Sequence, residues 1–127
     1  MVVLTAVAAC VLVVPGVAEA AWFAYAANRG TNNISQYSIG SDGALSPLGA
    51  TTAVTNSAPW DVVVSPDARS LYASYAGPLN AIAEFDIGAD GTLTPKQGHE
   101  TIAAGDGPNN LAISPDGRQL YLSLIHI

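Results

Sequence analysis

Apolar and polar residues alternate along this chain in short segments that turn residues separate. Within Ala81–Ile87, Phe85 and the other odd-numbered residues fall on one side of an extended backbone, whereas Glu84 and Asp86 fall on the other. The segment Asp61–Val64 is instead a short apolar run, which is typical of a strand buried on both faces. Together with frequent Gly and Pro, these patterns favour strands and turns over long helices.

The same landmarks recur in the same order along the chain. Asn33–Gly40 returns 48 positions later as Ala81–Gly88, and the turn Ser65–Asp67 returns after 49 positions as Ser114–Asp116. Each unit contains four predicted strands, and the last of the complete unit is expected as one continuous strand over residues 93–103. A four-stranded antiparallel unit with this period is typical of a β-propeller.

We therefore predict an all-β chain, a β-propeller fragment of about two four-stranded antiparallel blades. Strands two to four of one blade are expected over residues 22–54, a full blade over 61–103, and strands one and two of a third over 110–122. Propellers close with about four to eight blades, so we interpret the chain as part of a protein of roughly 330 residues if seven blades are assumed.

The N-terminal segment resembles a secretory signal. Val2–Val14 is an uncharged apolar run, and the small residues of Ala18–Ala20 follow it in the A-x-A pattern of a cleavage site. We predict a signal peptide over residues 1–20, a propeller fragment over 21–122 and a non-native tail over 123–127. The protein would then be exported to the periplasm or the cell exterior, without membrane association after cleavage. An uncleaved anchor is the alternative, since no Lys or Arg precedes the run.

Composition narrows the possible partners. The 127 residues include four Lys and Arg against ten Asp and Glu, a formal net charge of −6, so we expect no nucleic-acid partner. Cys10 is the only cysteine and would leave with the signal peptide, which removes disulfides, a thiol nucleophile and thiolate metal ligands. We predict no metal site and no cofactor, and the sequence does not predict an oligomeric state.

Blade topology sorts the loops onto two faces. Strands alternate in direction, so the second-to-third and fourth-to-first connections open on one face, which we call the ligand face because its loops differ between copies. The opposite face repeats the Ser-Pro-Asp turns and Asp-Gly hairpins, so Ser65 and Ser114 are interpreted as turn residues. Five candidate site residues lie on the ligand face: Arg29, Trp60, Asp61, Asn109 and Asn110.

Each candidate has a functional and a structural interpretation. Arg29 could clamp a carboxylate or phosphate, or be a solvated loop cation. Trp60 could stack on a sugar ring or pack between blades. Asp61 and Asn110 occupy equivalent positions, where they could orient a water or hold a cation, or cap buried backbone groups. His99 is expected on the outer strand, far from the channel, and His126 is given no role.

The loop and strand motifs resemble a known family. They are Tyr25–Gly30, Asn33–Ile39, Ser41–Leu45, Ala58–Asp67 and Leu71–Tyr72. These motifs are similar to those of the bacterial lactonase family of seven-bladed propellers, relatives of 6-phosphogluconolactonase, and to the YVTN-repeat surface propellers. The resemblance covers residues 22–122.

The resemblance implies a function. It implies a protein that opens a sugar lactone with a water activated by a carboxylate or His, while an Arg or Asn stabilises the oxyanion, and the N-terminal segment would make this an exported enzyme. Enzymatic members carry Arg and His after the Pro that opens the innermost strand, where this chain has Trp60-Asp61 and Asn109-Asn110. The alternative is a non-enzymatic periplasmic or cell-surface propeller that binds protein or glycan.

Overall fold

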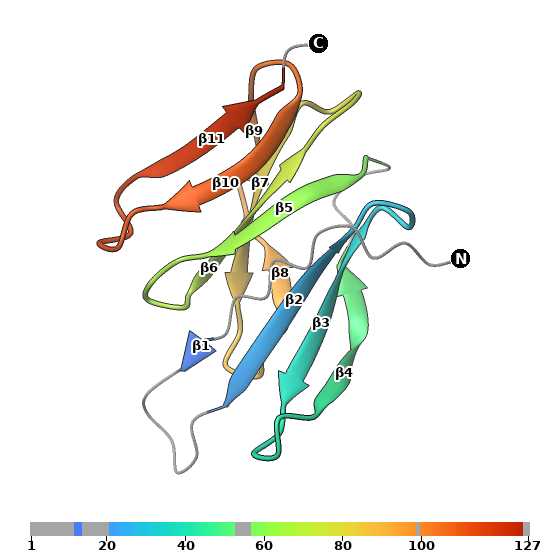
Figure 1. Cartoon of the computed structure of the whole chain (residues 1–127), viewed down its shortest axis with the longest axis vertical. Coiled ribbons are helices and arrows are strands. Elements are labelled where there is room, and N and C mark those ends of the chain that lie inside the picture. The colour runs from blue at the N-terminus through green and yellow to red at the C-terminus, as the bar shows by residue number, and fades with distance from the viewer. Residues whose placement is uncertain (1–11, 14–20, 53–56, 99, 126–127) are drawn as a thin grey trace.

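A computed structural model of the chain describes residues 12–13, 21–52, 57–98 and 100–125, and these form antiparallel sheets without a helix (Figure 1). The first blade consists of β2 (Trp22–Asn28), β3 (Asn33–Ile39) and β4 (Leu45–Thr52), which pair in chain order. The short strand β1 (Leu12–Val13) pairs with the start of β2. The first blade therefore follows the predicted order of strands two to four.

The second blade is the complete one. It contains β5 (Pro59–Val64), β6 (Ser70–Tyr75), β7 (Ala81–Ile87), β8 (Leu93–Pro95) and β9 (Thr101–Ala103). The first four strands pair in sequence, and β9 pairs with β7 beside β8. Side chains on β7 alternate as expected, with Phe85 fully buried and Asp86 exposed.

The prediction of one continuous fourth strand over residues 93–103 is wrong. The backbone N–H of Lys96 donates to the carbonyl of Glu84, and the N–H of Glu84 donates to the carbonyl of Glu100. Both bonds go to one residue of β7, so the intervening chain loops out of the sheet. Gly98 permits this because its φ of 77° is costly for other residues. The expected position of His99 lies outside the described residues.

The third blade comprises β10 (Pro108–Ile113) and β11 (Leu120–Leu124). The three sheets stack as successive blades (Figure 1), which confirms the predicted fold class. β11 extends to Leu124, two residues beyond the predicted end at Leu122. Ser123 accepts a hydrogen bond from the backbone N–H of Asn110, so this part of the predicted tail follows the blade geometry.

The main core lies between the first and second blades. Its largest fully buried side chains include Tyr25 and Ile34 from the first blade and Leu71, Tyr75 and Phe85 from the second. Burial of large apolar side chains from both sheets stabilises the face-to-face stacking. The blades are thus joined through their faces rather than through a continuous sheet.

Polar bonds set the register between these two blades. The hydroxyl of Tyr25 donates to the carbonyl of Gly91 at 2.7 Å, and the backbone N–H of Leu93 donates to Oε1 of Gln36 at 2.9 Å. Gly91 has a φ of 83°, and an added Cβ would overlap the ring of Phe23. The β7–β8 hairpin therefore packs directly on the first blade.

The predicted signal peptide lies mostly outside the described residues, and cleavage after Ala20 stays a prediction. Of that segment the structure describes Leu12 and Val13, which pair with Phe23 and Trp22. Within the described part of the chain, no helix is long and apolar enough to cross a membrane.

Candidate functional site

The predicted sorting of loops is present in the structure. The β2–β3, β6–β7 and β9–β10 connections lie at one end of the strands, toward the top and right of Figure 1. The two Ser-Pro-Asp turns and the Asp-Gly hairpins lie at the other end. The ligand face is therefore formed by segments from all three blades.

Arg29 and Trp60 meet on the ligand face across the first two blades. Arg29 lies on the β2–β3 hairpin, and Trp60 is the second residue of β5. The Cζ atom of Arg29 stands 3.4 Å from the centroid of the Trp60 ring, which is a close cation–π contact. The stacking holds an otherwise flexible arginine in one orientation.

This contact bears on both the functional and the structural interpretations of Arg29 and Trp60. Trp60 is half-buried between blades, and the guanidinium covers one face of its indole, so that face is not open to a sugar ring. Arg29 is exposed and forms no ion pair with any carboxylate of the described residues. Its N–H groups point along the plane of the stacked guanidinium, where they can donate to an anionic or carbonyl oxygen.

Asp61 joins the second blade to the third. Its Oδ1 accepts a hydrogen bond from the backbone N–H of Val62 at 2.9 Å, and its Oδ2 accepts one from the backbone N–H of Leu111 at 2.8 Å. Each carboxylate oxygen thus accepts a hydrogen bond from a part-buried backbone N–H group. The geometry supports the capping role for Asp61, because the carboxylate is oriented by the protein's own backbone.

Ser74 completes this connection, and sequence reasoning missed it. The fully buried hydroxyl of Ser74 accepts a hydrogen bond from the backbone N–H of Asp61 and donates to the carbonyl of Asn109. The signal was present, since Ser123 recurs 49 positions after Ser74. Asn109 is therefore held through its backbone, and its neighbour Asn110 has an exposed side chain.

Tyr75, next to Ser74, carries a second buried hydroxyl near the ligand face. The side chain is fully buried, and its hydroxyl has no hydrogen-bond partner among the described residues. Burial in apolar surroundings raises the pKa of Tyr75 to about 12. The phenol therefore stays protonated and is a donor rather than a base near neutral pH.

Hydrogen bonds also join the β6–β7 loop of the second blade to the β9–β10 connection that leads into the third blade. Nδ2 of Asn80 donates to Oδ1 of Asp106 at 3.3 Å, and the backbone N–H of Gly107 donates to Oδ1 of Asn80. Within the described residues, no group of three or more His, Cys, Asp or Glu is placed to hold a metal ion.

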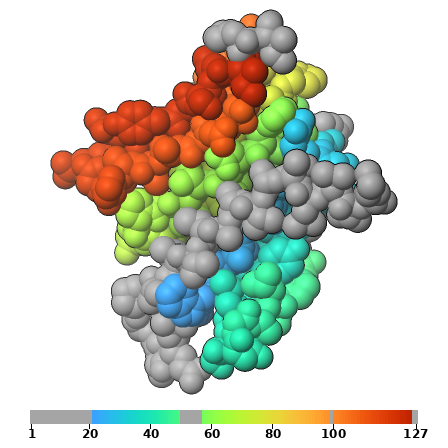
Figure 2. Space-filling model, viewed as in Figure 1, coloured from blue at the N-terminus to red at the C-terminus, as the bar shows by residue number. Residues whose placement is uncertain are grey.

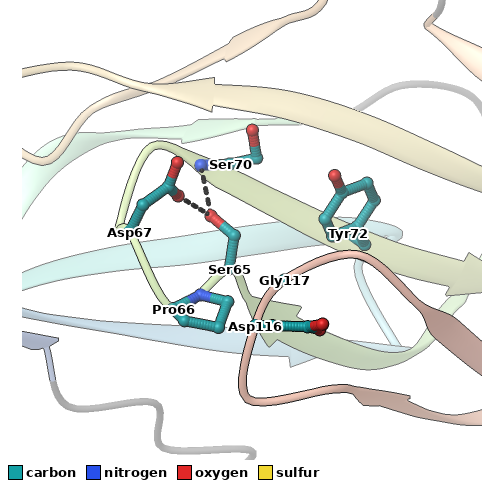
Figure 3. Close-up of a pocket in the computed structure, with 7 residues that line it drawn as sticks. All are labelled: Ser65, Pro66, Asp67, Ser70, Tyr72, Asp116 and Gly117. Carbon is teal, nitrogen blue, oxygen red and sulfur yellow. Dashed lines mark hydrogen bonds between the residues drawn. The ribbon is translucent and has the colours of Figure 1, made fainter.

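A cleft of about 350 Å³ opens on the opposite face, between the two Ser-Pro-Asp turns (Figure 3). The hydroxyl of Ser65 donates to Asp67 at 2.6 Å, and the hydroxyl of Ser114 bonds Asp116 in the same way. These bonds hold the pKa of each carboxyl below its ordinary value. Both carboxylates shape their own turns, so we assign the cleft no ligand.

Part of the chain matches a known protein family. Residues 47–124 match the family described as lactonase, seven-bladed β-propeller, so the match includes Trp60, Asp61, Asn109 and Asn110 but not Arg29. No curated protein sequence matches the chain.

Several solved structures are similar to the chain, and three of them carry the comparison. A proposed 6-phosphogluconolactonase from Bacteroides fragilis is 29% identical with a TM-score of 0.73, over 80% of this chain and 28% of that protein. One from Bacteroides uniformis is 27% identical with a TM-score of 0.73, over 80% and 29%. A periplasmic gluconolactonase from Pseudomonas aeruginosa is 23% identical with a TM-score of 0.69, over 79% and 29%. The chain thus spans less than a third of the length of these three proteins.

Proposed function

This chain belongs to the family of seven-bladed β-propeller lactonases, and from that membership we propose that the protein hydrolyses a sugar lactone on its ligand face. The observation that supports this site is Arg29, a guanidinium stacked on Trp60 at 3.4 Å without a carboxylate partner in the described chain. The proposed 6-phosphogluconolactonases among the similar structures support the substrate class.

Arg29 would act on the oxyanion. Water adds to the lactone carbonyl carbon, the carbonyl oxygen becomes an oxyanion, and the ring oxygen leaves with a proton as a hydroxyl group. A fixed guanidinium stabilises the oxyanion and the carboxylate product. Stacking on Trp60 keeps the donors in place, so little reorganisation is needed when charge develops.

Asp61 is not the base in this proposal. Both of its oxygens accept backbone hydrogen bonds, and one of these bonds holds the neighbouring blade. A carboxylate used in this way is oriented toward the protein rather than toward a substrate water. We assign no general base to the described residues.

Hydrolysis of glucono-δ-lactone by the intact protein tests this proposal. Arg29→Ala should lower kcat/KM by about 10²-fold, as loss of one oxyanion donor does. Arg29→Lys should recover part of the rate, because a lysine keeps the charge but not the flat stacking. The control is Arg118→Ala, which removes an exposed arginine on the opposite face. Hydrolysis no faster than the spontaneous reaction would reject the enzyme, and equal rates for the two alanine variants would reject Arg29 as its oxyanion donor.

A binding protein is the second candidate. It is favoured by the backbone bonds that occupy Asp61 and by Asn109-Asn110 at the equivalent place in the next blade. Such a protein would hold a glycan or a protein on the same face without turnover. Saturable binding of a sugar acid without hydrolysis, lost in Arg29→Ala and retained in Arg118→Ala, would support it.

Export is proposed on independent grounds. The apolar run Val2–Val14 and the small residues of Ala18–Ala20 support secretion, and the similar gluconolactonase from Pseudomonas aeruginosa is periplasmic. Cell fractionation with N-terminal sequencing tests it. A mature protein that starts at Ala21 in the exported fraction is expected, and an uncleaved cytoplasmic protein would contradict it.

A further inference from the structure

Four aspartates of this chain are followed directly by glycine: Asp42, Asp90, Asp106 and Asp116. Such a pair can rearrange in water alone, because glycine has no side chain to keep its backbone nitrogen away from the aspartate carboxyl carbon. The nitrogen adds to that carbon, the N–H proton and the carboxyl hydroxyl leave as water, and a five-membered succinimide forms. Water then reopens the ring at either carbonyl. One product is aspartate, and the other is isoaspartate, in which the main chain runs through the side-chain carboxyl.

Three of the four pairs are held by the same two hydrogen bonds. The carboxylates of Asp42, Asp90 and Asp116 each accept from the backbone N–H two residues further on, at 3.0 to 3.1 Å. The glycine N–H of each pair donates to the carbonyl three residues earlier at 2.9 Å. Ring closure must break both bonds, since the carboxyl has to turn its face to the nitrogen and the nitrogen has to lose its proton.

Side-chain hydroxyls protect two of these three aspartates further. Thr92 donates to Asp90 at 2.7 Å, and Ser114 donates to Asp116. These bonds hold the pKa of each carboxyl below its ordinary value. A carboxyl loses its hydroxyl group readily only in the protonated form, so the lowered pKa also disfavours ring closure.

Within the described residues, Asp106 and Gly107 make neither of the two bonds. The residue two positions after Asp106 is Pro108, which has no backbone N–H to donate. The N–H of Gly107 donates to Oδ1 of Asn80 at 3.4 Å, and Nδ2 of the same side chain donates to Asp106 at 3.3 Å. Both distances exceed the usual range of about 2.7–3.2 Å. A single rotation of the Asn80 side chain therefore releases the carboxyl and the nitrogen together.

Exposure and glycine conformation do not distinguish the four pairs. All four aspartates are exposed, and the four glycines have φ between 67° and 83°. The difference lies in the hydrogen bonds, and for Asp106 it follows from Pro108 and from the long bonds to Asn80.

We propose that Asp106 is a modification site, at which the folded protein forms isoaspartate. The nucleophile is the backbone nitrogen of Gly107, and water is both the leaving group and the only other reactant. Asp106 lies in the β9–β10 connection on the ligand face, which leads from the second blade into the third; Figure 2 shows the third blade, in orange and red, against the green second blade. Isoaspartate adds one carbon to the main chain just before Pro108, which breaks the link to Asn80. The proposal does not depend on lactonase activity.

Ageing of the purified, intact protein at 37 °C and about pH 6 tests the proposal. Peptide mapping with electron-transfer fragmentation distinguishes isoaspartate from aspartate at all four sites in one sample. Isoaspartate at position 106 should accumulate at least about tenfold faster than at positions 42, 90 and 116, as expected where each of these must first break a stronger hydrogen bond. Asp106→Glu is the matched control. It keeps the carboxylate but would need a larger ring, so it should remove the signal at position 106 and leave the other three sites unchanged.

Ageing in urea separates the effect of the fold from that of the local sequence. In the unfolded chain all four pairs lose their hydrogen bonds, so their rates of isoaspartate formation should become similar. The proposal is overturned if position 106 reacts no faster than position 42 in the folded protein. It is equally overturned if the excess at position 106 persists in urea, because the neighbouring residues alone would then account for it.

Discussion

Asp61 and Leu111 are 50 residues apart in the chain, yet the carboxylate of the first accepts the backbone N–H of the second at 2.8 Å. Asp61 lies in β5, the innermost strand of the second blade, and Leu111 lies in β10, the innermost strand of the third. This bond therefore holds the two blades together at the ligand-face end. The position that the family resemblance links with catalysis here stabilises the stacking.

Replacing Asp61 should therefore weaken folding. Asp61→Ala leaves the part-buried N–H groups of Val62 and Leu111 without an acceptor, and we expect a loss of about 2–3 kcal/mol in the free energy of unfolding. Asp61→Asn retains one oxygen acceptor and should lose about half as much. Urea denaturation measures both, with Asp86→Ala as the exposed control. Equal stability of Asp61→Ala and the parent would show that the two hydrogen bonds to the Asp61 carboxylate contribute nothing to folding.

The sequence predicted the blades because their signals are local. Alternation within Ala81–Ile87 and the recurrence of Ser65–Asp67 at Ser114–Asp116 depend only on neighbouring residues, so strand order and loop faces followed from them. The break between β8 and β9 was missed because it depends on the backbone of Glu84, whose carbonyl accepts from the N–H of Lys96 and whose N–H donates to the carbonyl of Glu100.

The candidate site was predicted less completely. The five residues were chosen by loop position, which is enough to place them on one face but not to pair them. Arg29 meets Trp60 only because two blades stack, and no pattern within either blade encodes that contact. The structural role of Ser74 could have been found from the 49-residue spacing of Ser74 and Ser123. The bond between Asp61 and the backbone of Leu111 could be identified only from the fold.

Two glycines allow the stability cost of backbone strain to be distinguished from the cost of disturbed packing. Gly43 and Gly91 are repeat equivalents with φ of 81° and 83°, but only Gly91 lies against Phe23. Gly43→Ala should cost about 1–2 kcal/mol of stability from the left-handed backbone alone. Gly91→Ala should cost clearly more, because the methyl group must displace the buried ring. Thermal unfolding of the two variants checks this, and equal losses would mean that the hairpin moves away from the first blade without cost.

Two buried tyrosines should respond in opposite directions to loss of the hydroxyl. Tyr75 has no partner for its hydroxyl among the described residues, so Tyr75→Phe removes a desolvated polar group and should raise stability by about 1 kcal/mol. Tyr25→Phe removes the 2.7 Å bond to the carbonyl of Gly91 and should lower stability by a similar amount. Chemical denaturation of both variants measures the signs. A destabilised Tyr75→Phe would reveal a bonded partner, such as an ordered water.

The same tyrosines predict how stability depends on alkaline pH. Desolvation raises the pKa of both Tyr25 and Tyr75 from 10 to about 12 in the folded chain. Between these values the unfolded chain loses the phenolic protons while the folded chain keeps them, so stability is intact below pH 10 and falls as the pH rises toward 12. Each tyrosine contributes up to about 3 kcal/mol to this fall. Denaturation curves at pH 9, 10 and 11 measure the slope, which should be shallower in Tyr75→Phe and unchanged in Tyr121→Phe, where the ring is exposed. If Tyr75→Phe and the parent lose stability equally over this range, the buried phenol is not the group that titrates.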